Sequence, residues 1–249
     1  MLEGHSGKVT GVCMTDDGCT AISCSHDRTV CVWDISDEQL SETSGSSSGS
    51  PRSKLSKGGR NGRKYHGHKG AMTAVACHTT SSLLVSACED HSIKLWNVED
   101  GSYRGEIRGY PALVMCLCIS PDGTQLYAGA RDNLIKVWSL AGLADGKTEL
   151  CSRGCLLRDL VGHTDWVTSL DISGELELEG GGEGEGEGKG MGRIVASCSN
   201  DCTARLYSYR NGSCLRILKF HTGSVNAISI SPDCKLVITG SSDRTAILW

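Results

Sequence analysis

Histidine, a hydroxyl residue and aspartate recur together along this 249-residue chain, first as His5, Ser23 and Asp27. These are the residue types of a hydrolase triad, in which the hydroxyl attacks a carbonyl, the imidazole takes up its proton and the carboxylate orients the imidazole. The combination returns in most of five copies, whereas catalysis requires it only once. We therefore expect these residues to be structural and the chain not to be an enzyme.

The copies follow a fixed spacing. Each begins with Gly-His or a variant of it, and each contains an aspartate that is followed six positions later by an aromatic residue. The starting pairs are Gly4-His5, Gly67-His68, Gly109-Tyr110, Gly162-His163 and Phe220-His221. The aspartate and aromatic pairs are Asp27/Trp33, Asp90/Trp96, Asp132/Trp138, Asp201/Tyr207 and Asp243/Trp249. Successive aromatic residues are 63, 42, 69 and 42 positions apart, so the unit is 42 residues with two intervals lengthened by insertions.

Each unit has the pattern of short strands separated by tight turns. In the first unit, alternating residues predict strands over Val9 to Met14, Ala21 to Ser25 and Thr29 to Trp33. Ser-Pro-Asp and Ser-x-Asp-x-Thr segments between the strands are typical of turns. A fourth strand follows the aromatic residue, as in Cys214 to Lys219. The pattern predicts one antiparallel four-stranded sheet per unit.

These residues resemble the WD-repeat β-propeller family, whose repeat of about 40–45 residues runs from Gly-His to Trp-Asp. The literal Trp-Asp is kept at Trp33-Asp34. The resemblance implies an all-β propeller of five four-stranded antiparallel blades, with the last blade incomplete because the sequence ends at Trp249. We expect 19 strands, in blades that either close by themselves or form a fragment of a larger ring. The expected repeats cover about 2–36, 65–98, 107–140, 160–209 and 218–249.

The resemblance also implies a buried hydrogen-bonded tetrad in each blade, formed by the histidine, a strand hydroxyl, the turn aspartate and the strand aromatic residue. Three matched tetrads are His5, Ser23, Asp27 and Trp33; His68, Ser86, Asp90 and Trp96; and His221, Thr239, Asp243 and Trp249. The fourth copy is His163, Ser197, Asp201 and Tyr207, and the third is Tyr110, Ala128, Asp132 and Trp138. Because the third copy lacks the histidine and the hydroxyl and the fourth lacks the indole, we expect these two blades to be less stable.

Two insertions interrupt the repeats, at residues 37–64 and 174–192. The first is rich in serine and glycine and has basic residues in its second half; the second alternates glycine and glutamate. We expect both to be disordered. In an antiparallel meander they fall at one end of the blades, whereas the Gly-His and aspartate turns lie at the other. The first insertion could act as a nuclear-import signal, a tether for an acidic partner or a phosphorylation target, or could be a tolerated loop expansion.

Composition narrows the class of protein. The net charge of −4 does not favour a nucleic-acid binder, and no apolar stretch is long enough to span a membrane. The 14 cysteines lack paired Cys-x-x-Cys spacing, so we expect reduced, mostly buried thiols without a metal or cofactor. A metal site at His66, His68 and His78 is disfavoured because His68 belongs to a tetrad. The expected location is the cytoplasm, with the nucleus as an alternative.

The Gly-His end carries the candidate partner-binding residues. The position three residues after the histidine varies between copies, and Trp166 occupies it in the fourth, outside the tetrad position of the other tryptophans. The varying residues are Lys8, Ala71, Leu113, Trp166 and Ser224. Residues beside the turn aspartate complete the candidate surface: His26, Arg28, Glu89, Arg131 and Arg244. An exposed tryptophan is a typical binding anchor, but Trp166 could equally pack on the loop of a neighbouring blade.

The favoured function is a non-catalytic scaffold or adaptor that binds protein or peptide partners through the rim and loops. Neither a membrane nor a small-molecule substrate is expected as a partner, and nucleic acid is disfavoured. One alternative is a substrate receptor of a ubiquitin ligase, although the Trp-Asp-x-Arg of such receptors is matched only by the arginine of Tyr207-Ser208-Tyr209-Arg210. A second alternative is an RNA-associated propeller that uses the basic insertion.

Overall fold

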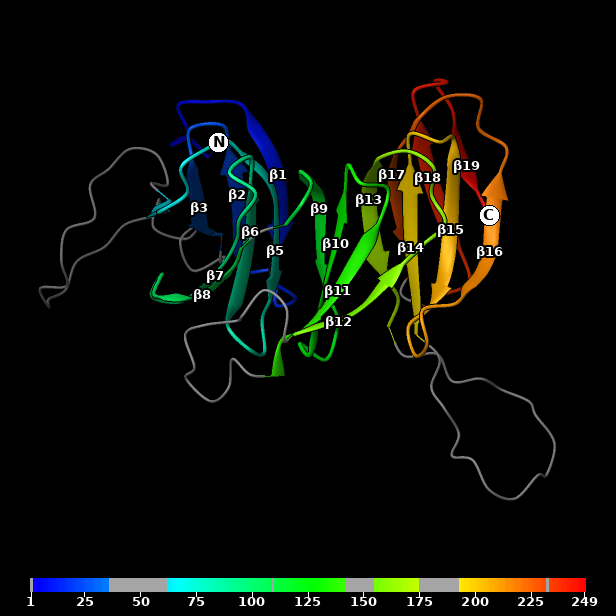
Figure 1. Ribbon diagram of the computed structural model, residues 1–249. Coiled ribbons are helices and arrows are strands. Elements are labelled where there is room, and N and C mark those ends of the chain that lie inside the picture. Colours follow the sequence, from blue (N-terminus) through cyan, green and yellow to red (C-terminus); the bar gives the residue numbers. More distant parts are fainter. Residues whose placement is uncertain (1, 36–61, 109, 142–154, 175–192, 232) are drawn as a thin grey trace, which may run out of the picture.

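The structure is a computed structural model that describes residues 2–35, 62–108, 110–141, 155–174, 193–231 and 233–249. These residues form 19 strands in five antiparallel sheets, which we call blades 1 to 5 (Figure 1). Each blade is a meander in which strands that follow one another in sequence are hydrogen-bonded neighbours. The expected all-β architecture, including an incomplete last blade, is confirmed. Within the described residues, no helix is long and apolar enough to cross a membrane.

The strand bounds repeat from blade to blade. Blade 1 contains β1 (Val9–Met14), β2 (Thr20–Ser25), β3 (Thr29–Asp34) and β4 (Arg63–His66). Blade 2 contains β5 (Met72–His78), β6 (Leu83–Cys88), β7 (Ile93–Asn97) and β8 (Tyr103–Ile107). Blade 3 contains β9 (Val114–Ile119), β10 (Gln125–Ala130), β11 (Ile135–Ser139) and β12 (Leu156–Leu160). Blade 4 contains β13 (Val167–Ile172), β14 (Ile194–Ser199), β15 (Thr203–Ser208) and β16 (Cys214–Lys219). Blade 5 contains β17 (Val225–Ile230), β18 (Val237–Ser241) and β19 (Ala246–Leu248).

The insertions fall in connections between strands of the same blade. Residues 37–61 and 175–192 lie outside the described residues, so their expected disorder stays a prediction. Arg63 and Lys64, which the sequence assigned to the first insertion, instead begin strand β4. They pair with Val32 and Cys31 of β3, and this ladder extends blade 1 by its fourth strand. The basic run that supported an RNA-binding role is thus partly used in the sheet.

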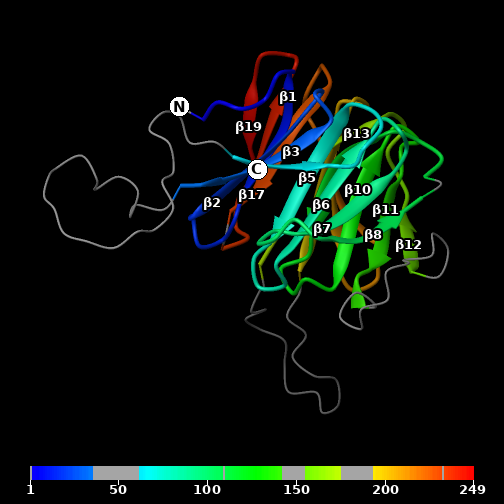
Figure 2. The same ribbon diagram turned by 90° about the vertical axis from the view of Figure 1, so that its left-hand side faces the viewer.

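The hydrophobic cores lie between the blades. Strand β6 shows why, since its two faces are both buried: Leu83 and Val85 pack toward blade 3, and Leu84 packs toward blade 1. A sheet covered on both faces needs apolar residues without strict alternation. Four such cores join the five blades in order, and Figure 2 shows the ribbons of blades 2 and 3 next to each other.

Polar contacts also join neighbouring blades. The Thr10 hydroxyl of blade 1 donates to the carbonyl of Met72 in blade 2, at 2.9 Å. At the boundary of blades 4 and 5, the Asp171 carboxylate accepts a hydrogen bond from the Ser229 hydroxyl at 2.9 Å. Each of these bonds satisfies a polar group at a junction that is otherwise packed by apolar side chains.

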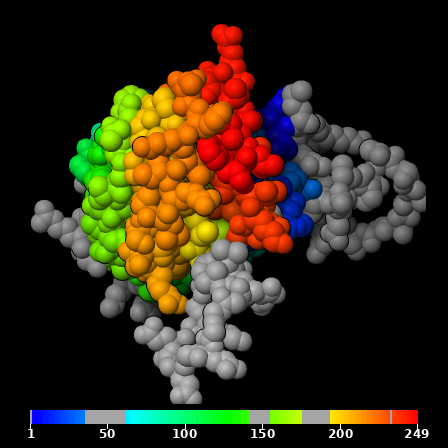
Figure 3. Space-filling view, turned by 90° about the vertical axis from the view of Figure 1, so that its right-hand side faces the viewer, coloured from blue at the N-terminus to red at the C-terminus, as the bar shows by residue number. Residues whose placement is uncertain are grey.

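The five blades form an open arc rather than a closed ring. No hydrophobic core joins blade 5 to blade 1 within the described residues, and Figure 1 shows blade 3 between the blue first blade and the red last blade. Both end blades expose apolar residues: Val12 is 74% and Met14 58% exposed in blade 1, and Ile238 is 48% and Leu248 62% exposed in blade 5. Figure 3 shows blade 5 at the surface beside blade 4. The alternative of a ring closed by five blades is not what the structure shows.

Candidate functional site

Blade 1 contains a continuous hydrogen-bonded network of the four residues that the resemblance implied. The His5 Nδ1 atom lies 2.9 Å from Asp27 Oδ2, and His5 Nε2 lies 2.8 Å from Ser23 Oγ. The Trp33 indole N–H donates to the same Ser23 Oγ at 2.8 Å. Because an ionised carboxylate only accepts, Nδ1 carries the proton and Nε2 accepts from the serine hydroxyl.

Blades 4 and 5 repeat the histidine contacts. His163 Nδ1 lies 2.8 Å from Asp201 Oδ2, and His221 Nδ1 lies 2.8 Å from Asp243 Oδ2. In blade 5 the Trp249 indole N–H completes the tetrad by donating to the Thr239 hydroxyl at 2.9 Å. In blade 4 the phenol oxygen of Tyr207 is buried without a hydrogen-bond partner. The fourth tetrad is therefore incomplete at its aromatic member.

Blade 2 departs from this geometry at the aspartate. His68 Nε2 contacts Ser86 Oγ at 2.8 Å, and Trp96 donates to Ser86 Oγ at 2.8 Å, as in blade 1. However, His68 Nδ1 and Asp90 Oδ2 are 3.7 Å apart, which is too long for a hydrogen bond. The Asp90 carboxylate keeps the Ser92 hydroxyl at 2.5 Å and the backbone N–H of Lys69 at 3.0 Å as its hydrogen-bond donors.

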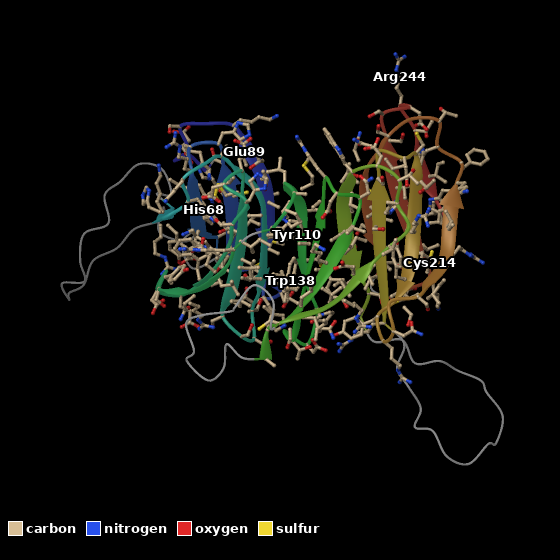
Figure 4. The ribbon with its side chains drawn as sticks, in the orientation of Figure 1. His68, Glu89, Tyr110, Trp138, Cys214 and Arg244 are labelled. Atoms are coloured by element: carbon tan, nitrogen blue, oxygen red, sulfur yellow. The ribbon has the colours of Figure 1, made fainter. Side chains whose placement is uncertain are left out.

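Blade 3 has no tetrad. Tyr110 and Trp138 are buried with their rings 5.5 Å apart, but the Tyr110 hydroxyl and the Trp138 indole N–H have no hydrogen-bond partner. Figure 4 shows the two side chains in the middle of the structure. The turn aspartate, Asp132, accepts from the backbone N–H of Leu134 at 3.2 Å. Two buried polar atoms without partners are consistent with the expected lower stability of this blade.

The network has a fifth member that was not predicted from the sequence. Two residues after the turn aspartate, a hydroxyl donates to the carboxylate Oδ1 atom at 2.5–2.7 Å in four blades. These residues are Thr29, Ser92, Thr203 and Thr245. The signal was visible in the Ser-x-Asp-x-Thr turns, but it was interpreted only as turn chemistry. Leu134 occupies this position in blade 3, so that blade lacks the fifth member as well.

The glycine of the Gly-His pair has a packing role. Gly67 has a φ of +153°, and a Cβ atom on it would lie 2.9 Å from the Trp96 ring. At Gly4 a Cβ atom would lie 2.8 Å from the Trp33 ring. Because carbon atoms do not approach so closely, a side chain here would displace the indole that donates to the strand hydroxyl. The pair therefore combines close approach at the glycine with hydrogen bonding at the histidine.

The networks change the protonation of their members. Burial raises the pKa of the Asp27 carboxyl, but hydrogen bonds from Thr29, Ser6 and His5 outweigh burial and hold this pKa well below its usual range. For Asp90, burial is likewise outweighed by the bonds from Ser92 and Lys69, which lower its pKa to about 2.

The histidines shift in the direction that burial dictates. Burial lowers the pKa of His68 and of His163, although the neighbouring carboxylates oppose the shift. At neutral pH the networks of blades 2 and 4 therefore pair a neutral imidazole with an ionised carboxylate.

The histidine, hydroxyl and aspartate are joined in the order of a hydrolase triad, yet the hydroxyl cannot act on a substrate. Ser23, Ser86, Ser197 and Thr239 are all buried, and in blades 1, 2 and 5 the indole N–H already donates to the oxygen that would have to attack. A nucleophile needs space for a carbonyl within about 3 Å. The geometry thus supports a structural role.

The candidate rim residues are brought together in pairs. The carbonyl of the residue three after the histidine accepts from the backbone N–H of the residue before the turn aspartate in every blade, at 2.9–3.0 Å. The pairs are Lys8 with His26, Ala71 with Glu89, Leu113 with Arg131, Trp166 with Asn200, and Ser224 with Ser242. Lys8, His26, Arg28, Glu89, Arg131 and Arg244 are exposed, and Leu113 is half-buried. Figure 4 shows Glu89 and Arg244 at the same end of the structure.

Arg28 and Arg244 also share an unusual backbone conformation. Each follows the turn aspartate and has a left-handed backbone, with φ of 69° and 70°. This conformation turns the chain sharply between two strands and leaves the side chain exposed at the turn. In Figure 4 the Arg244 side chain points away from the blades.

Trp166 is exposed and also packed on a neighbouring blade. Its side chain is 38% exposed, and the Arg131 guanidinium of blade 3 lies over its ring, 4.1 Å from the ring centroid. The Arg131 Nε–H also donates toward Met115 Sδ at 3.4 Å, which gives the guanidinium a second contact. Trp166 therefore packs on the neighbouring blade and keeps part of its surface exposed, while its role as a binding anchor stays a prediction. Sequence reasoning named both residues but could not pair them, because the contact crosses two blades.

The remaining sequence candidates do not form sites in the described residues. His78 contacts Ser81 and the Pro121 carbonyl, at the opposite end of β5 from the turn that carries His68. The imagined set of His66, His68 and His78 is therefore not assembled. Arg210 is exposed in the turn between β15 and β16, and its carbonyl accepts from Arg158. The cysteines of the described residues are free thiols.

Comparison with known proteins agrees with the five blades. The family model of the WD domain, G-beta repeat, matches residues 1–34, 59–97, 101–139, 154–208 and 212–249. The chain is 25% identical over 186 residues to autophagy-related protein 16 of Arabidopsis thaliana, covering 75% of this chain and 31% of that protein. It is 26% identical over 187 residues to the nuclear distribution protein nudF of Aspergillus niger, covering 74% and 37%.

A third relative matches along the whole chain. The chain is 24% identical over 262 aligned positions to eukaryotic translation initiation factor 3 subunit I of Pyricularia oryzae, covering 100% of this chain and 62% of that protein. The chain thus spans less than two thirds of the length of each of these relatives. Because the family model matches most of the chain in five successive copies, the protein belongs to the WD40 family of WD-domain, G-beta repeat proteins.

Proposed function

We propose that this protein is a non-catalytic scaffold that binds protein or peptide partners at the Gly-His end of its blades, with Trp166 as an anchor. The observation that carries the proposal is the pairing of the partly exposed Trp166 ring with the Arg131 guanidinium across blades 3 and 4. Tryptophan and arginine are the residues most often found at the energetic centre of protein interfaces. A cation held over the ring also fixes the indole before a partner arrives.

The chemistry of the surface suggests what it binds. Lys8, Arg28, Arg131 and Arg244 supply exposed positive charge, and Glu89 is the acidic member among the candidate residues. A segment that presents an apolar side chain to Trp166 and a carboxylate to Arg131 would match both groups. This arrangement fits an acidic peptide or an acidic protein surface, and the net charge of −4 disfavours a nucleic acid as the partner.

The relatives are consistent with this proposal. The initiation factor relative is by its name a subunit of a larger assembly, which is the setting in which a propeller that holds partners would act. For this chain the same role, and a location in the cytoplasm with the nucleus as an alternative, are proposals that rest on family membership. A ligase-receptor role through Arg210 and an RNA-binding role through the basic insertion remain secondary hypotheses.

The proposal can be tested with a displayed library of random peptides selected on the immobilised protein. Selected peptides should be enriched in acidic residues next to an aromatic or aliphatic residue. Their binding should fall at least tenfold in Trp166→Ala and in Arg131→Ala. Leu215→Ala is the matched control, because Leu215 is an exposed apolar residue on the outer strand β16 of blade 4. Peptides that bind Trp166→Ala as well as the unmodified protein would place the binding surface elsewhere.

A further inference from the structure

We propose that blade 2 contains a binding site for a zinc-like divalent metal ion, formed by His68, Cys88 and Asp90. One ligand atom from each residue, an imidazole nitrogen, a thiol sulfur and a carboxylate oxygen, lies within 4.8 Å of the other two. Nitrogen, sulfur and carboxylate oxygen together are a typical donor set for Zn²⁺. His68 and Cys88 are buried, while the Asp90 side chain is partly exposed and gives an ion a route from solvent.

Cys88 distinguishes blade 2 from the blades with the same histidine and aspartate. The equivalent position holds Ser25, Ser199 and Ser241 in blades 1, 4 and 5, where the serine oxygen accepts the backbone N–H of the turn aspartate at 3.0–3.1 Å. In blade 2 the Cys88 sulfur takes this contact at 3.4 Å. A thiol is a poorer acceptor than a hydroxyl but a far better ligand for zinc.

The histidine and aspartate of blade 2 are also spaced for a metal. His Nδ1 and Asp Oδ2 are 2.8–2.9 Å apart in blades 1, 4 and 5, which leaves room only for a shared proton. In blade 2 they are 3.7 Å apart. A nitrogen and an oxygen bound to the same tetrahedral zinc are separated by about 3.4 Å, given metal–ligand distances near 2.1 Å. The wider spacing and the cysteine therefore occur in the same blade.

The second ring nitrogen of His68 is held as it would be in a metal site. His68 Nε2 lies 2.8 Å from Ser86 Oγ, which also accepts the Trp96 indole N–H. Nδ1 lies 3.2 Å from the Ser92 hydroxyl oxygen, so a metal bound at Nδ1 would replace this contact. The proton of the neutral ring would then reside on Nε2 and be donated to Ser86. Metal-binding histidines commonly use their second nitrogen in this way, with the other nitrogen as the metal ligand.

Three protein ligands would leave the fourth zinc position to water, on the side of the partly exposed Asp90. The Cys88 side chain would have to move when the metal binds, because its sulfur must come within about 2.3 Å of the metal. The thiols of Cys19 and Cys214 are exposed and accessible to metal ions in solution, so the test must separate Cys88 from them.

The test is a Co²⁺ titration of the metal-free protein, followed by its near-ultraviolet thiolate-to-cobalt charge-transfer absorption. The unmodified protein should show an absorption that saturates at one equivalent and disappears when Zn²⁺ is added. Cys88→Ser should lose it, and this variant is expected to fold because serine is the residue of three other blades. Cys214→Ser is the matched control, which removes an exposed thiol on β16 and should retain the absorption (Figure 4).

Thermal melting supplies a second measurement. One equivalent of Zn²⁺ should raise the melting temperature of the unmodified protein and of Cys214→Ser, but not that of Cys88→Ser, since an ion that binds only the folded state stabilises it. Metal-free melts of the three proteins report whether each has folded. The proposal is overturned if the unmodified protein gives no saturable absorption, if Cys88→Ser keeps it, or if Cys214→Ser loses it.

Discussion

Ala128 has the same register relative to Trp138 as Ser23 has relative to Trp33, but it offers the indole no acceptor. In both blades the small residue lies two positions along its strand from the direct partner of the tryptophan. The Trp33 N–H donates to Ser23 Oγ at 2.8 Å, whereas the Trp138 N–H is buried without a partner. One methyl group in place of a hydroxymethyl group thus accounts for an unsatisfied donor in blade 3.

Replacing Ala128 with serine should stabilise the protein. The new hydroxyl would accept the Trp138 N–H, and a buried hydrogen bond of this kind contributes about 1 kcal/mol to the free energy of unfolding. The midpoint of urea unfolding should increase accordingly. Ser86→Ala is the reciprocal change and should cost about 1–3 kcal/mol, because it leaves the Trp96 N–H unpaired. A midpoint that falls in Ala128→Ser would show that the hydroxyl does not fit.

Removing the turn aspartate should have unequal effects in different blades. Asp27 accepts hydrogen bonds from His5, Ser6 and Thr29, whereas Asp132 accepts from the Leu134 amide. Asp27→Ala should therefore lower the free energy of unfolding by about 1–3 kcal/mol, and Asp132→Ala by less than about 1 kcal/mol. Asp90→Ala should resemble Asp27→Ala. Equal unfolding midpoints for the three variants would contradict this order.

The tetrads show how far the sequence could predict the site. Their members were identified by spacing, because a repeat places equivalent residues in equivalent positions, and Asp27 with His5 and Ser23 then follows from one matched blade. The incomplete third copy was also visible, since Ala128 cannot accept a hydrogen bond. Strand positions such as Val9–Met14 follow from the alternation of apolar residues and from the turns between them.

Two features of the site were not predictable from spacing. The contact of Arg131 with Trp166 depends on how two blades pack, and nothing in one repeat specifies its neighbour. The 3.7 Å separation of His68 and Asp90 differs by less than 1 Å from the distances in the other blades, and alternation and turn signals do not report so small a difference. Both features depend on the relative positions of strands and turns that the sequence itself predicted.

Stability should fall in two stages as the pH is lowered. Burial lowers the pKa of His68 and His163 in the folded state, so the unfolded chain binds more protons below its own histidine pKa of about 6.5 and stability decreases from that pH downward. The pKa of Asp90 is about 2, and those of Asp27 and Asp243 are also low, so a second loss begins below about 3.9, the pKa of an unfolded aspartate.

Urea unfolding midpoints measured between about pH 8 and about pH 3 would check the two stages. His163→Gln should weaken the first stage and leave the second in place. A midpoint that rises between pH 7 and pH 5 would contradict the sign derived from the histidines.

The cysteines should differ strongly in reactivity. Cys19 and Cys214 are exposed, whereas Cys24, Cys31, Cys88 and Cys198 are buried. Burial raises the pKa of Cys88 to about 11 and that of Cys198 to about 12, so little thiolate is present at neutral pH. Alkylation followed by mass spectrometry should label Cys19 and Cys214 first in native protein and should label the buried group only on unfolding. Early labelling of Cys198 in native protein would show that blade 4 opens readily.

The placement of each hydrophobic core between two blades makes the structure behave as a one-dimensional array of coupled units. An inner blade such as blade 3 shares apolar surface with two neighbours, while blades 1 and 5 each share it with one. The interaction free energy between blades then comes from four junctions. A destabilising substitution in one blade should therefore lower the stability mainly of the blades next to it. Fraying should accordingly begin at the terminal blades and move inward, so that the weak tetrad of blade 3 is protected by its central place in the array.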